Sequence, residues 1–330
     1  MVKLLPRRRT AEQFEPAYRD VLRQLSEASV HQHFDAFLDI PWDDPLFGRR
    51  PDDDCWILPE ADAVGGHPWY RTLPKERQRE IGRYRYGLVA KVGLQFEQFL
   101  IAGVMFRLLW LDNENPEFRY ATHEITEETH HTQMFQEAVN RIAPEIHGLS
   151  GSFKACAPLI ASMGWLFPEF FFTMVLAIEE PIDHLQKAIM RSSDEIHPLV
   201  ARVMQIHIAE EARHISFGHE YLEEHVPHLD PVRKALLAVL FPLTMRIACD
   251  LILKPNKRAL RDMGIPEEVA REIWWDSPES RKALRDVFGD IRMLADNIGV
   301  RNTLTKPLWR ALGIDGRPSR YRAQPASAAH

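Results

Sequence analysis

Two Glu-x-x-His motifs, each preceded by a lone glutamate at the same distance, constrain the fold of this chain more than any other feature. In each half, the lone glutamate lies in an apolar stretch 31 residues before the glutamate of the motif. The six residues of the two halves are Glu97, Glu128, His131, Glu180, Glu211 and His214. A dimetal site in a four-helix bundle uses this set, with one Glu from each of two helices and a Glu-x-x-His from each of the others.

Helical periodicity prevails along the chain, and alternating strand patterns are scarce. We therefore expect an all-α, ferritin-like four-helix bundle with a dimetal carboxylate site and additional N- and C-terminal helices. The four long helices are expected at about 74–111, 117–142, 166–192 and 195–225. Other expected features are a helix near 10–38, a loose link around Gly148, Gly151 and Gly164, and helices at about 230–263 and 266–296.

These elements predict one main domain with additions at both ends. Residues 74–225 should form the bundle core, and residues 1–73 should supply an N-terminal helix and an irregular, Pro- and Asp-rich segment that pack on it. Residues 226–315 should add C-terminal helices to the same domain. Residues 316–330, rich in Arg, Pro, Ser and Ala, are typical of a disordered tail.

Composition excludes several classes of protein. The 330 residues are 45% hydrophobic and carry a net charge of -6, which suits a globular protein and gives no electrostatic reason to expect nucleic acid. Three widely spaced cysteines predict no disulfide framework and favour a reducing cytoplasm. The basic start lacks the apolar run of a signal peptide, and no segment has the roughly 18 uninterrupted apolar residues of a membrane span.

Each lone glutamate lies on an apolar helix face, where an unpaired carboxylate is costly and needs a cation, a partner or a proton. For Glu97, the alternative to metal binding is a buried pair with arginine or a protonated side chain. For Glu180, the neighbouring Glu179 is a rival, and the equal spacing of the two halves favours Glu180. Pro181 follows directly, so we expect a local distortion of that helix.

The first motif has two possible registers, because Glu127 and His130 have the same spacing as Glu128 and His131. The register with Glu128 and His131 preserves the equal spacing of the two halves. The face that carries His123, Glu127 and His130 then reads as solvated.

Two further polar residues lie one turn before the motifs. His207 precedes Glu211 by four residues, so it can reach the same cluster, although a lone histidine there is also typical of a hydrogen-bonded core residue. Glu124 stands at the equivalent place before Glu128. It could be an extra ligand, an acceptor behind a ligand or a surface acid, and we favour the acceptor. Such carboxylate- and imidazole-rich sites suit iron or manganese, and their open positions favour oxidation with O2.

Helical phase also predicts an apolar substrate cavity beside the ligands. Its expected lining is Gly93, Leu94, Leu100, Ile101, Thr173, Leu176 and Ala177. Small residues beside large ones leave room for an apolar guest, although ordinary core packing would give the same pattern.

The chain resembles the ferritin-like diiron oxygenases typified by p-aminobenzoate N-oxygenase and its arylamine-oxygenase relatives. The resemblance covers roughly residues 75–225 and rests on Phe96-Glu97-Gln98, Glu127-Glu128-Thr129-His130-His131-Thr132, Glu179-Glu180 and Ile206-His207-Ile208-Ala209-Glu210-Glu211-Ala212-Arg213-His214. It implies two irons bound by seven residues, His207 being the addition to the six named above. It also implies O2 activation through a peroxo-type species and oxygenation of an aryl amine to hydroxylamine, nitroso or nitro products.

One departure concerns the substrate. The p-aminobenzoate enzyme holds its substrate carboxylate with polar and cationic groups on the helix of the first glutamate. In this chain, Lys91 is the only cationic residue in the two helical turns before Glu97, and it lies about 120° away from the helix face that carries the ligand. The apolar residues there are Leu88, Val89, Val92, Leu94 and Phe96. The resemblance therefore supports the metal chemistry of the family in this chain better than it supports p-aminobenzoate as the substrate.

We expect a diiron oxygenase, with manganese as a possible metal, that acts on a small apolar or aromatic substrate. N-oxygenation is the reaction that the resemblance implies, and hydroxylation or desaturation of an apolar substrate is the close alternative. No flavin or nicotinamide fingerprint is present, so electrons should come from an external reductase or ferredoxin. A homodimer is expected from the resemblance and from the extra C-terminal helices.

Three other functions compete with this interpretation. Iron storage in a cage is one of them, and against it the 330 residues far exceed a minimal four-helix storage subunit. A radical generator or ligand-binding oxidase needs a tyrosine near a metal, and Tyr84, Tyr86 and Tyr120 are not at ligand spacing. A helical scaffold without a metal would make the repeat of glutamates and histidines a coincidence.

Overall fold

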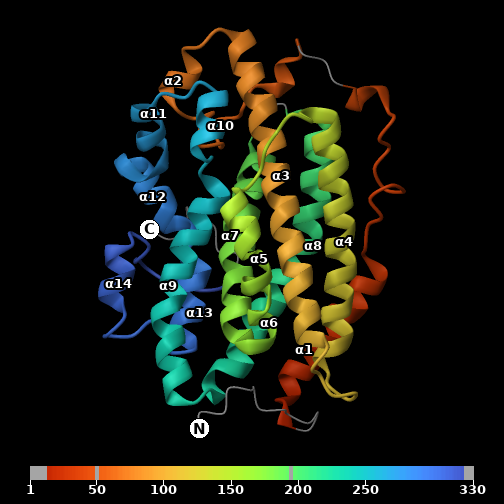
Figure 1. Ribbon diagram of the computed structural model, residues 1–330, viewed down its shortest axis with the longest axis vertical. Helices are drawn as coiled ribbons and strands as arrows, with labels where there is room; N and C mark the ends of the chain where they lie inside the picture. The colour runs from red at the N-terminus through yellow and green to blue at the C-terminus, as the bar shows by residue number, and fades with distance from the viewer. Residues whose placement is uncertain (1–12, 49–51, 193–195, 323–330) are drawn as a thin grey trace.

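The computed structural model describes residues 13–48, 52–192 and 196–322, and these parts of the chain contain helices and no strand. Four long helices form the bundle seen in Figure 1. They are α3 (Lys75–Leu108), α4 (Glu117–Ile142), α7 (Pro168–Arg191) and α8 (Pro198–His225). The predicted all-α, ferritin-like bundle is confirmed, and the four expected helices agree with the observed ones to within a few residues at each end.

Prolines and capping side chains set where several helices begin. Helices α7, α8 and α9 (Pro231–Leu253) each start with a proline, whose missing N–H costs nothing in the first turn. Asp230 caps α9 by accepting from the backbone N–H groups of Val232 and Arg233. These local signals explain why the helix starts could be predicted from sequence.

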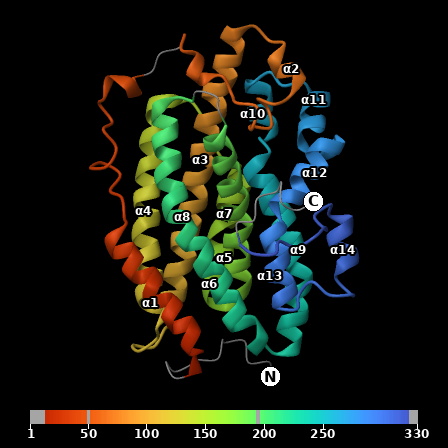
Figure 2. The ribbon, with the colours of Figure 1, turned by 180° about the vertical axis from the view of Figure 1, so that it is seen from behind.

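The bundle is built from two antiparallel pairs. Helix α3 packs along α4, α7 packs along α8, and α4 also contacts α8. Helix α1 (Pro16–His31) crosses α4 and α8, as Figure 2 shows from behind. Helix α9 lies along α7 outside the bundle.

The core of the bundle has an apolar cluster on either side of a polar layer. On α3, Leu94 and Phe96 belong to one cluster, while Phe99 and Leu100 belong to the other. Glu97 lies between them and is buried. The fold therefore places charged side chains at mid-height of the bundle, away from water.

The link between the two halves is more ordered than predicted. It forms α5 (Gly151–Ala161) and α6 (Met163–Leu166), where a loose stretch was expected. Ser150 starts α5 by accepting from the backbone N–H of Phe153. The expectation of a loose link was wrong because glycines were read as breakers, whereas a capped, mainly apolar segment packs on α3 as a helix.

The C-terminal region consists of short helices. They are α10 (Lys257–Asp262), α11 (Glu267–Arg271), α12 (Pro278–Val287), α13 (Gly289–Asn297) and α14 (Lys306–Ala311). The single helix expected at 266–296 is therefore wrong. The chain breaks at Trp275, whose φ is 88°, and Ser277 then caps the next helix. The helix expected at 230–263 is interrupted between Leu253 and Lys257.

The segment between α1 and α3 is irregular, as expected. It contains the short turns η2 (Pro45–Phe47) and η3 (Asp54–Trp56) and helix α2 (Pro68–Arg71). Two more turns, η4 (Val226–His228) and η5 (Glu272–Asp276), join later helices.

Both ends of the chain extend beyond the described residues. Of the helix expected at 10–38, residues 16–31 are helical and residues 10–12 lie outside the description. Of the tail expected to be disordered, residues 323–330 lie outside the described residues. The part before them contacts the protein, since Arg322 pairs with Glu220 at 2.6 Å.

Two helical stretches, Lys75–Leu108 and Pro231–Asp262, would be long and apolar enough to cross a membrane by length and composition alone. Core helices pass the same test, and 56% and 44% of their most apolar windows are buried inside the protein. They are weak evidence for a membrane span.

Candidate metal centre

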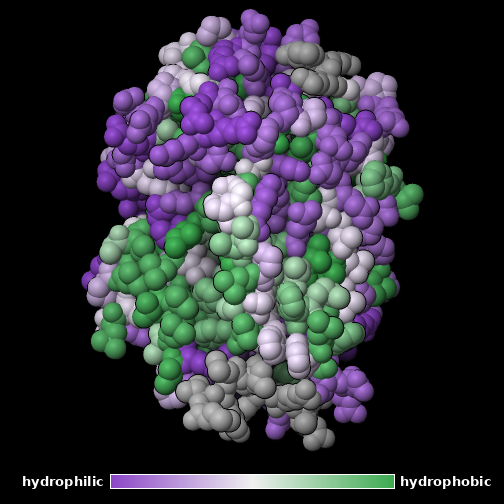
Figure 3. All heavy atoms as spheres, in the orientation of Figure 1, coloured by the Kyte–Doolittle hydropathy of each residue, from purple (hydrophilic) through white to green (hydrophobic). Residues whose placement is uncertain are grey.

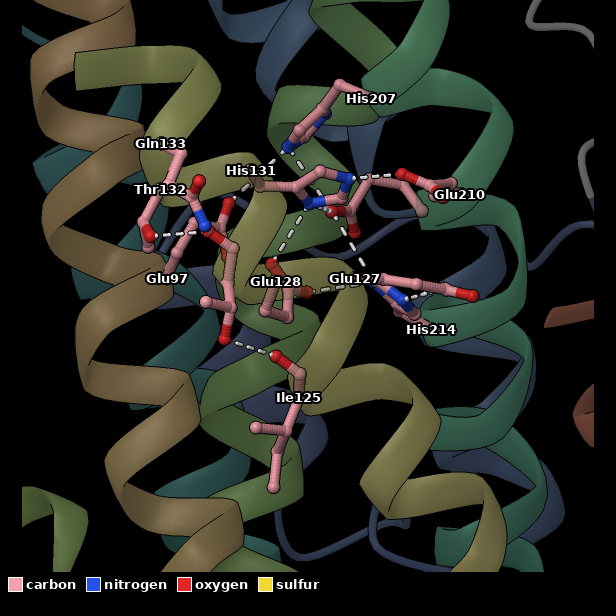
Figure 4. A network of polar contacts seen from close by, with 12 residues as sticks. Glu97, Ile125, Glu127, Glu128, His131, Thr132, Gln133, His207, Glu210 and His214 are labelled. Atoms are coloured by element: carbon pink, nitrogen blue, oxygen red, sulfur yellow. Dashed lines mark hydrogen bonds and ion pairs between the residues drawn. The ribbon is translucent and has the colours of Figure 1, made fainter. Parts of the chain in front are cut away.

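Six buried side chains converge at mid-height of the bundle and form two overlapping groups that could each hold a metal ion. One group is Glu97, His131, His207 and Glu211, and the other is Glu128, His131, Glu211 and His214. Within each group the potential ligand atoms lie within 4.8 Å of one another. His131 and Glu211 belong to both, so the geometry provides for two adjacent ions with shared ligands (Figure 4).

Glu211 is the centre of this arrangement. Its Oε1 lies 3.2 Å from His207 Nε2 and 3.5 Å from the Nδ1 atoms of both His131 and His214. Glu128 faces the last two imidazoles from α4, with Oε2 3.1 Å from His131 Nδ1 and Oε1 2.8 Å from His214 Nδ1. Three imidazoles thus turn one nitrogen each toward Glu211, and two of them also face Glu128.

The opposite nitrogen of each imidazole donates to an acceptor outside the cluster. The pairs are His131 with Glu210 at 2.9 Å, His214 with Glu127 at 2.8 Å and His207 with Gln186 at 2.8 Å. These bonds select the tautomer and the orientation of each ring. Because the outer nitrogen carries the proton, the inner nitrogen keeps its lone pair for a metal.

Sequence reasoning missed these three acceptors. The face of Glu127 was expected to be solvated, but this side chain is buried. That prediction was wrong because α1 and α8 both pack on α4 and cover its outer side. The paired acids Glu127-Glu128 and Glu210-Glu211 were a usable signal, since the first acid of each pair binds an imidazole and the second faces the centre.

Arg213 and the segment after α1 brace the acceptors. Arg213 Nη2 lies 2.9 Å from Glu127 Oε1 and 3.6 Å from Glu210 Oε1, and it donates to the carbonyl of Gln32. The backbone N–H of Phe34 donates to Glu210 at 3.0 Å. The N-terminal segment is therefore part of the support for the histidines.

The structure does not bring Glu180 to the cluster, and the neighbouring Glu179 lines the cavity beside it instead. Glu180 Oε1 lies 2.7 Å from His219 Nε2. Glu179 is buried, lines the same cavity as Glu97 and His207, and has no hydrogen-bond partner on either oxygen among the described residues. Adjacent helical residues point about 100° apart, so only one of them can face the centre.

The buried acids of the cluster need either protons or a cation to offset their negative charge. Burial raises the pKa of Glu97 and of Glu179 well above the usual range, and the neighbouring carboxylates add to the effect. Burial alone would lower the pKa of His131, but Glu128 raises it to about 10. Burial lowers the pKa of His207 to about 4. Protons thus take the place that a cation would fill in a buried set of acids.

The donor set fits two iron or manganese ions. It offers four carboxylates and three imidazoles and contains no thiol, which is the ligand chemistry of these metals in oxygen-rich sites. Buried acceptor atoms without a partner also indicate a site for a cation. Both oxygens of Glu179 and Oε2 of Glu211 have no hydrogen-bond or ion-pair partner within the described ranges, and such atoms are rare in native proteins.

Glu124 is a buried acid, so the surface alternative is wrong. Burial raises the pKa of Glu124 to about 8, and neither of its oxygens has a hydrogen-bond partner among the described residues. The favoured role as an acceptor behind a ligand stays a prediction, since no hydrogen bond from a ligand to Glu124 is present among the described residues. It also lies outside the two four-residue groups.

A narrow cavity extends from the cluster along the bundle toward the start of α3. Of the seven residues predicted to line a substrate pocket, Gly93 lines this cavity. The others are not part of its wall: Leu94, Leu100, Ile101, Thr173, Leu176 and Ala177. Most of these follow Glu97 on α3 or precede Glu179 on α7, so they lie on the opposite side of the centre, where apolar packing fills the space. Helical phase could not tell which side of the centre stays open.

The fold and this centre together define a helical-bundle protein of the ferritin-like class with a buried cluster of carboxylates and histidines that could hold metal ions. Residues 15–299 match the family described as P-aminobenzoate N-oxygenase AurF, and the chain belongs to that family. Uncharacterised proteins of Mycobacterium tuberculosis (strain CDC 1551 / Oshkosh) and Mycobacterium bovis (strain ATCC BAA-935 / AF2122/97) are each 47% identical to it over 308 residues. The aligned part covers 93% of this chain and 91% of each relative. The resemblance seen in the sequence is confirmed, and the oxygenase family supports an enzyme.

Proposed function

We propose that this protein is a diiron oxygenase that uses O2 to oxidise a small molecule, with N-oxygenation of an amine as the reaction. The observation that carries the proposal is the pair of overlapping four-residue groups that share His131 and Glu211 inside the bundle. The family supports the reaction type, because its description names an N-oxygenase.

Seven residues would hold the two ions: Glu97, Glu128, His131, Glu179, His207, Glu211 and His214. Reduced iron bound there would supply the reaction with O2, with manganese as the alternative metal. The residues around it keep the imidazoles in place through Glu127, Glu210 and Gln186. Apolar walls above and below the polar layer exclude bulk water from the centre.

Hydroxylation or desaturation of an apolar substrate is the second candidate reaction. It is favoured by the lining of the cavity next to Glu97 and His207, which is mainly aliphatic and aromatic. An apolar cavity at the centre has no role in iron storage, so it also argues against a storage protein.

Electrons would come from an external reductase or ferredoxin. We place the protein in the cytoplasm, a proposal supported by the wide spacing of the three cysteines, which predicts no disulfide framework. We also propose a homodimer. The support is a row of exposed apolar side chains along α9: Val232, Leu236, Val239, Ile247 and Leu251.

The first experiment is anaerobic loading with ferrous iron, desalting and measurement of iron per chain, followed by exposure to O2 with aryl amines as trial substrates. We expect about two irons per chain, as for other bundle sites of this type, and O2 uptake by the reduced protein. His214→Ala should lose iron and O2 uptake together. Zero or one iron in the parent protein would overturn the proposal.

A further inference from the structure

The cavity beside the metal centre has polar groups at its two ends and an apolar middle. Glu97, Glu179 and His207 lie at the centre, whereas Asp62, Arg85 and Tyr86 lie at the far end. Arg85 precedes Glu97 by 12 residues on α3, and at 1.5 Å per residue this separates the two levels by roughly 18 Å. Between them the wall is largely apolar, including Ala90, Phe96, Phe135, Ile182 and Met204.

Tyr86 supplies an unused hydroxyl at the far end. Its side chain is 5% exposed, and the hydroxyl has no hydrogen-bond partner among the described residues. A buried hydroxyl without a partner is unfavourable and rare. The arrangement is explained if a ligand brings an acceptor to this position.

Arg85 lines the same end of the cavity as Tyr86 and is paired there with Asp62. Its Nε lies 3.2 Å from Asp62 Oδ2, and its Nη1 donates to the carbonyl of Leu253 at 3.4 Å. Asp62 is itself held by the backbone N–H groups of Val64 and Gly65. A guanidinium has five N–H donors in a planar fork, so Arg85 keeps donors for a further acceptor.

A second, more open hollow adjoins this end and shares Arg85, Val89, Val92 and Ile252 with the inner cavity. It lies between α3 and the segment that joins α9 to α10, and the exposed Lys254 and Lys257 line it.

Charge in this hollow favours an anion. Asp250 is the only acid among its described lining residues, and it is already paired with Arg246 and bonded by Trp275 Nε1. A negatively charged group is therefore attracted to the outer end of the route and not to the metal end.

We propose that the substrate is an elongated amphiphile whose carboxylate head binds Arg85 and Tyr86 and whose apolar body extends along the cavity and brings the amine to be oxidised to the metal centre. The inference deepens the proposed function, on which it rests for what happens at the metal end. It differs from the substrate in the family's description, because a single benzoate is too short to reach both ends of the cavity. Tyr86 and Arg85 are then binding residues that select the head group.

The test uses the metal-free protein and straight-chain carboxylates from hexanoate to hexadecanoate, below their aggregation thresholds, with binding measured by calorimetry. We expect the affinity to rise with chain length and to fall once the chain exceeds the cavity. Dodecanol should bind at least about tenfold more weakly than dodecanoate. This ratio follows from the roughly 1.5–3 kcal/mol of a hydrogen bond to a charged group.

Tyr86→Phe is the decisive variant, because it removes a hydroxyl that has no partner within the described ranges and should not lower the melting temperature. We expect it to weaken dodecanoate binding about tenfold. Tyr84→Phe is the matched control, since Tyr84 lies on the same helix and its hydroxyl donates to Asp262, away from the cavity. Arg85→Lys should bind more tightly than Arg85→Gln, because it keeps the charge.

Equal binding of dodecanoate and dodecanol, or equal affinities of the two tyrosine variants, would overturn the head-group assignment. Failure of every carboxylate to bind would overturn the substrate class. Because no metal is present, these results are independent of the iron content that tests the proposed function.

Discussion

At the scale of single residues, Glu179 and Glu180 show how helical phase decides which side chain faces the centre. Both are glutamates on α7, yet only Glu179 lines the cavity with Glu97, while Glu180 pairs with His219. The equal spacing of 31 residues in the two halves favoured Glu180. That spacing would be decisive only if both pairs of helices were joined by connections of equal geometry, and α3–α4 and α7–α8 are joined by different ones.

This difference leads to a test. Glu179→Ala should lower the iron content from about two per chain to about one or less, because it removes one of four carboxylates. Glu180→Ala should keep about two, since it breaks only the pair with His219. Metal analysis after anaerobic loading measures both. The reverse pattern would restore Glu180 as the ligand.

A second acid far from the metal centre should control stability at low pH. Glu117 accepts from His225 Nε2 at 2.6 Å, from Arg107 Nη2 at 3.0 Å and from the Tyr18 hydroxyl at 3.2 Å. Burial alone would raise the pKa of Glu117, but His225 and Arg107 lower it from 4.5 to about 2. Since the folded pKa is depressed, the ionised carboxylate stabilises the fold above pH 4.5, and this contribution is lost as the pH falls from 4.5 toward 2.

We therefore expect Glu117→Gln to lower the free energy of unfolding by about 3–5 kcal/mol at neutral pH, because it leaves Arg107 buried without its partner. The variant should also lose the part of the pH dependence between 4.5 and 2 that the Glu117 carboxylate contributes. Urea unfolding at a series of pH values measures both effects. Glu114→Gln, at an exposed position, is the control for loss of one charge. An unchanged pH slope in Glu117→Gln would refute this account.

At the scale of elements, α3 and α6 approach so closely that only glycine fits between them. A Cβ on Gly164 would lie 2.0 Å from the carbonyl oxygen of Gly103, which is backbone and cannot rotate away. A Cβ on Gly103 would meet the ring of Phe171 at the same distance. The close contact lets α6 cover the end of α3 that follows Glu97.

Gly164→Ala should therefore lower the free energy of unfolding by about 1–3 kcal/mol, because it forces the two helices apart. Gly151→Ala is the matched control. A Cβ there meets nothing within 4 Å, and the change should be neutral or stabilise by about 0.4–1 kcal/mol. Thermal or urea unfolding compares the two. Equal stabilities would show that the α3–α6 contact is adaptable.

At the scale of the whole molecule, one face carries an apolar patch that the fold leaves uncovered. Figure 3 shows hydrophobic side chains gathered on the lower half of the face where α9 lies. The row along α9 includes Leu236, which is 49% exposed, and Ile247, which is 59% exposed. Patches of this kind are typical of protein–protein contacts, and the proposed homodimer would cover it.

The dimer is tested by changing both residues to glutamate. Leu236→Glu with Ile247→Glu should convert a dimer into a monomer, because each charge would be buried in the interface. Light scattering after gel filtration measures the mass. Leu38→Glu, at an 86% exposed position in the N-terminal segment, is the control and should stay dimeric. A parent protein that is monomeric at all concentrations would contradict the proposed dimer.

The sequence by itself determined the fold class and most of the centre, because both depend on local periodicity. Residues three or four apart share a helix face, so the Glu-x-x-His pairs and His207 were predictable as groups, and prolines and caps marked where helices start. Only the tertiary structure decided which of Glu179 and Glu180 lines the cavity. It also decided that Glu127 is buried and that the cavity extends toward Arg85. These features depend on how each helix is rotated about its axis and on which distant segments pack against it. Neither quantity is encoded in the spacing of residues along one helix.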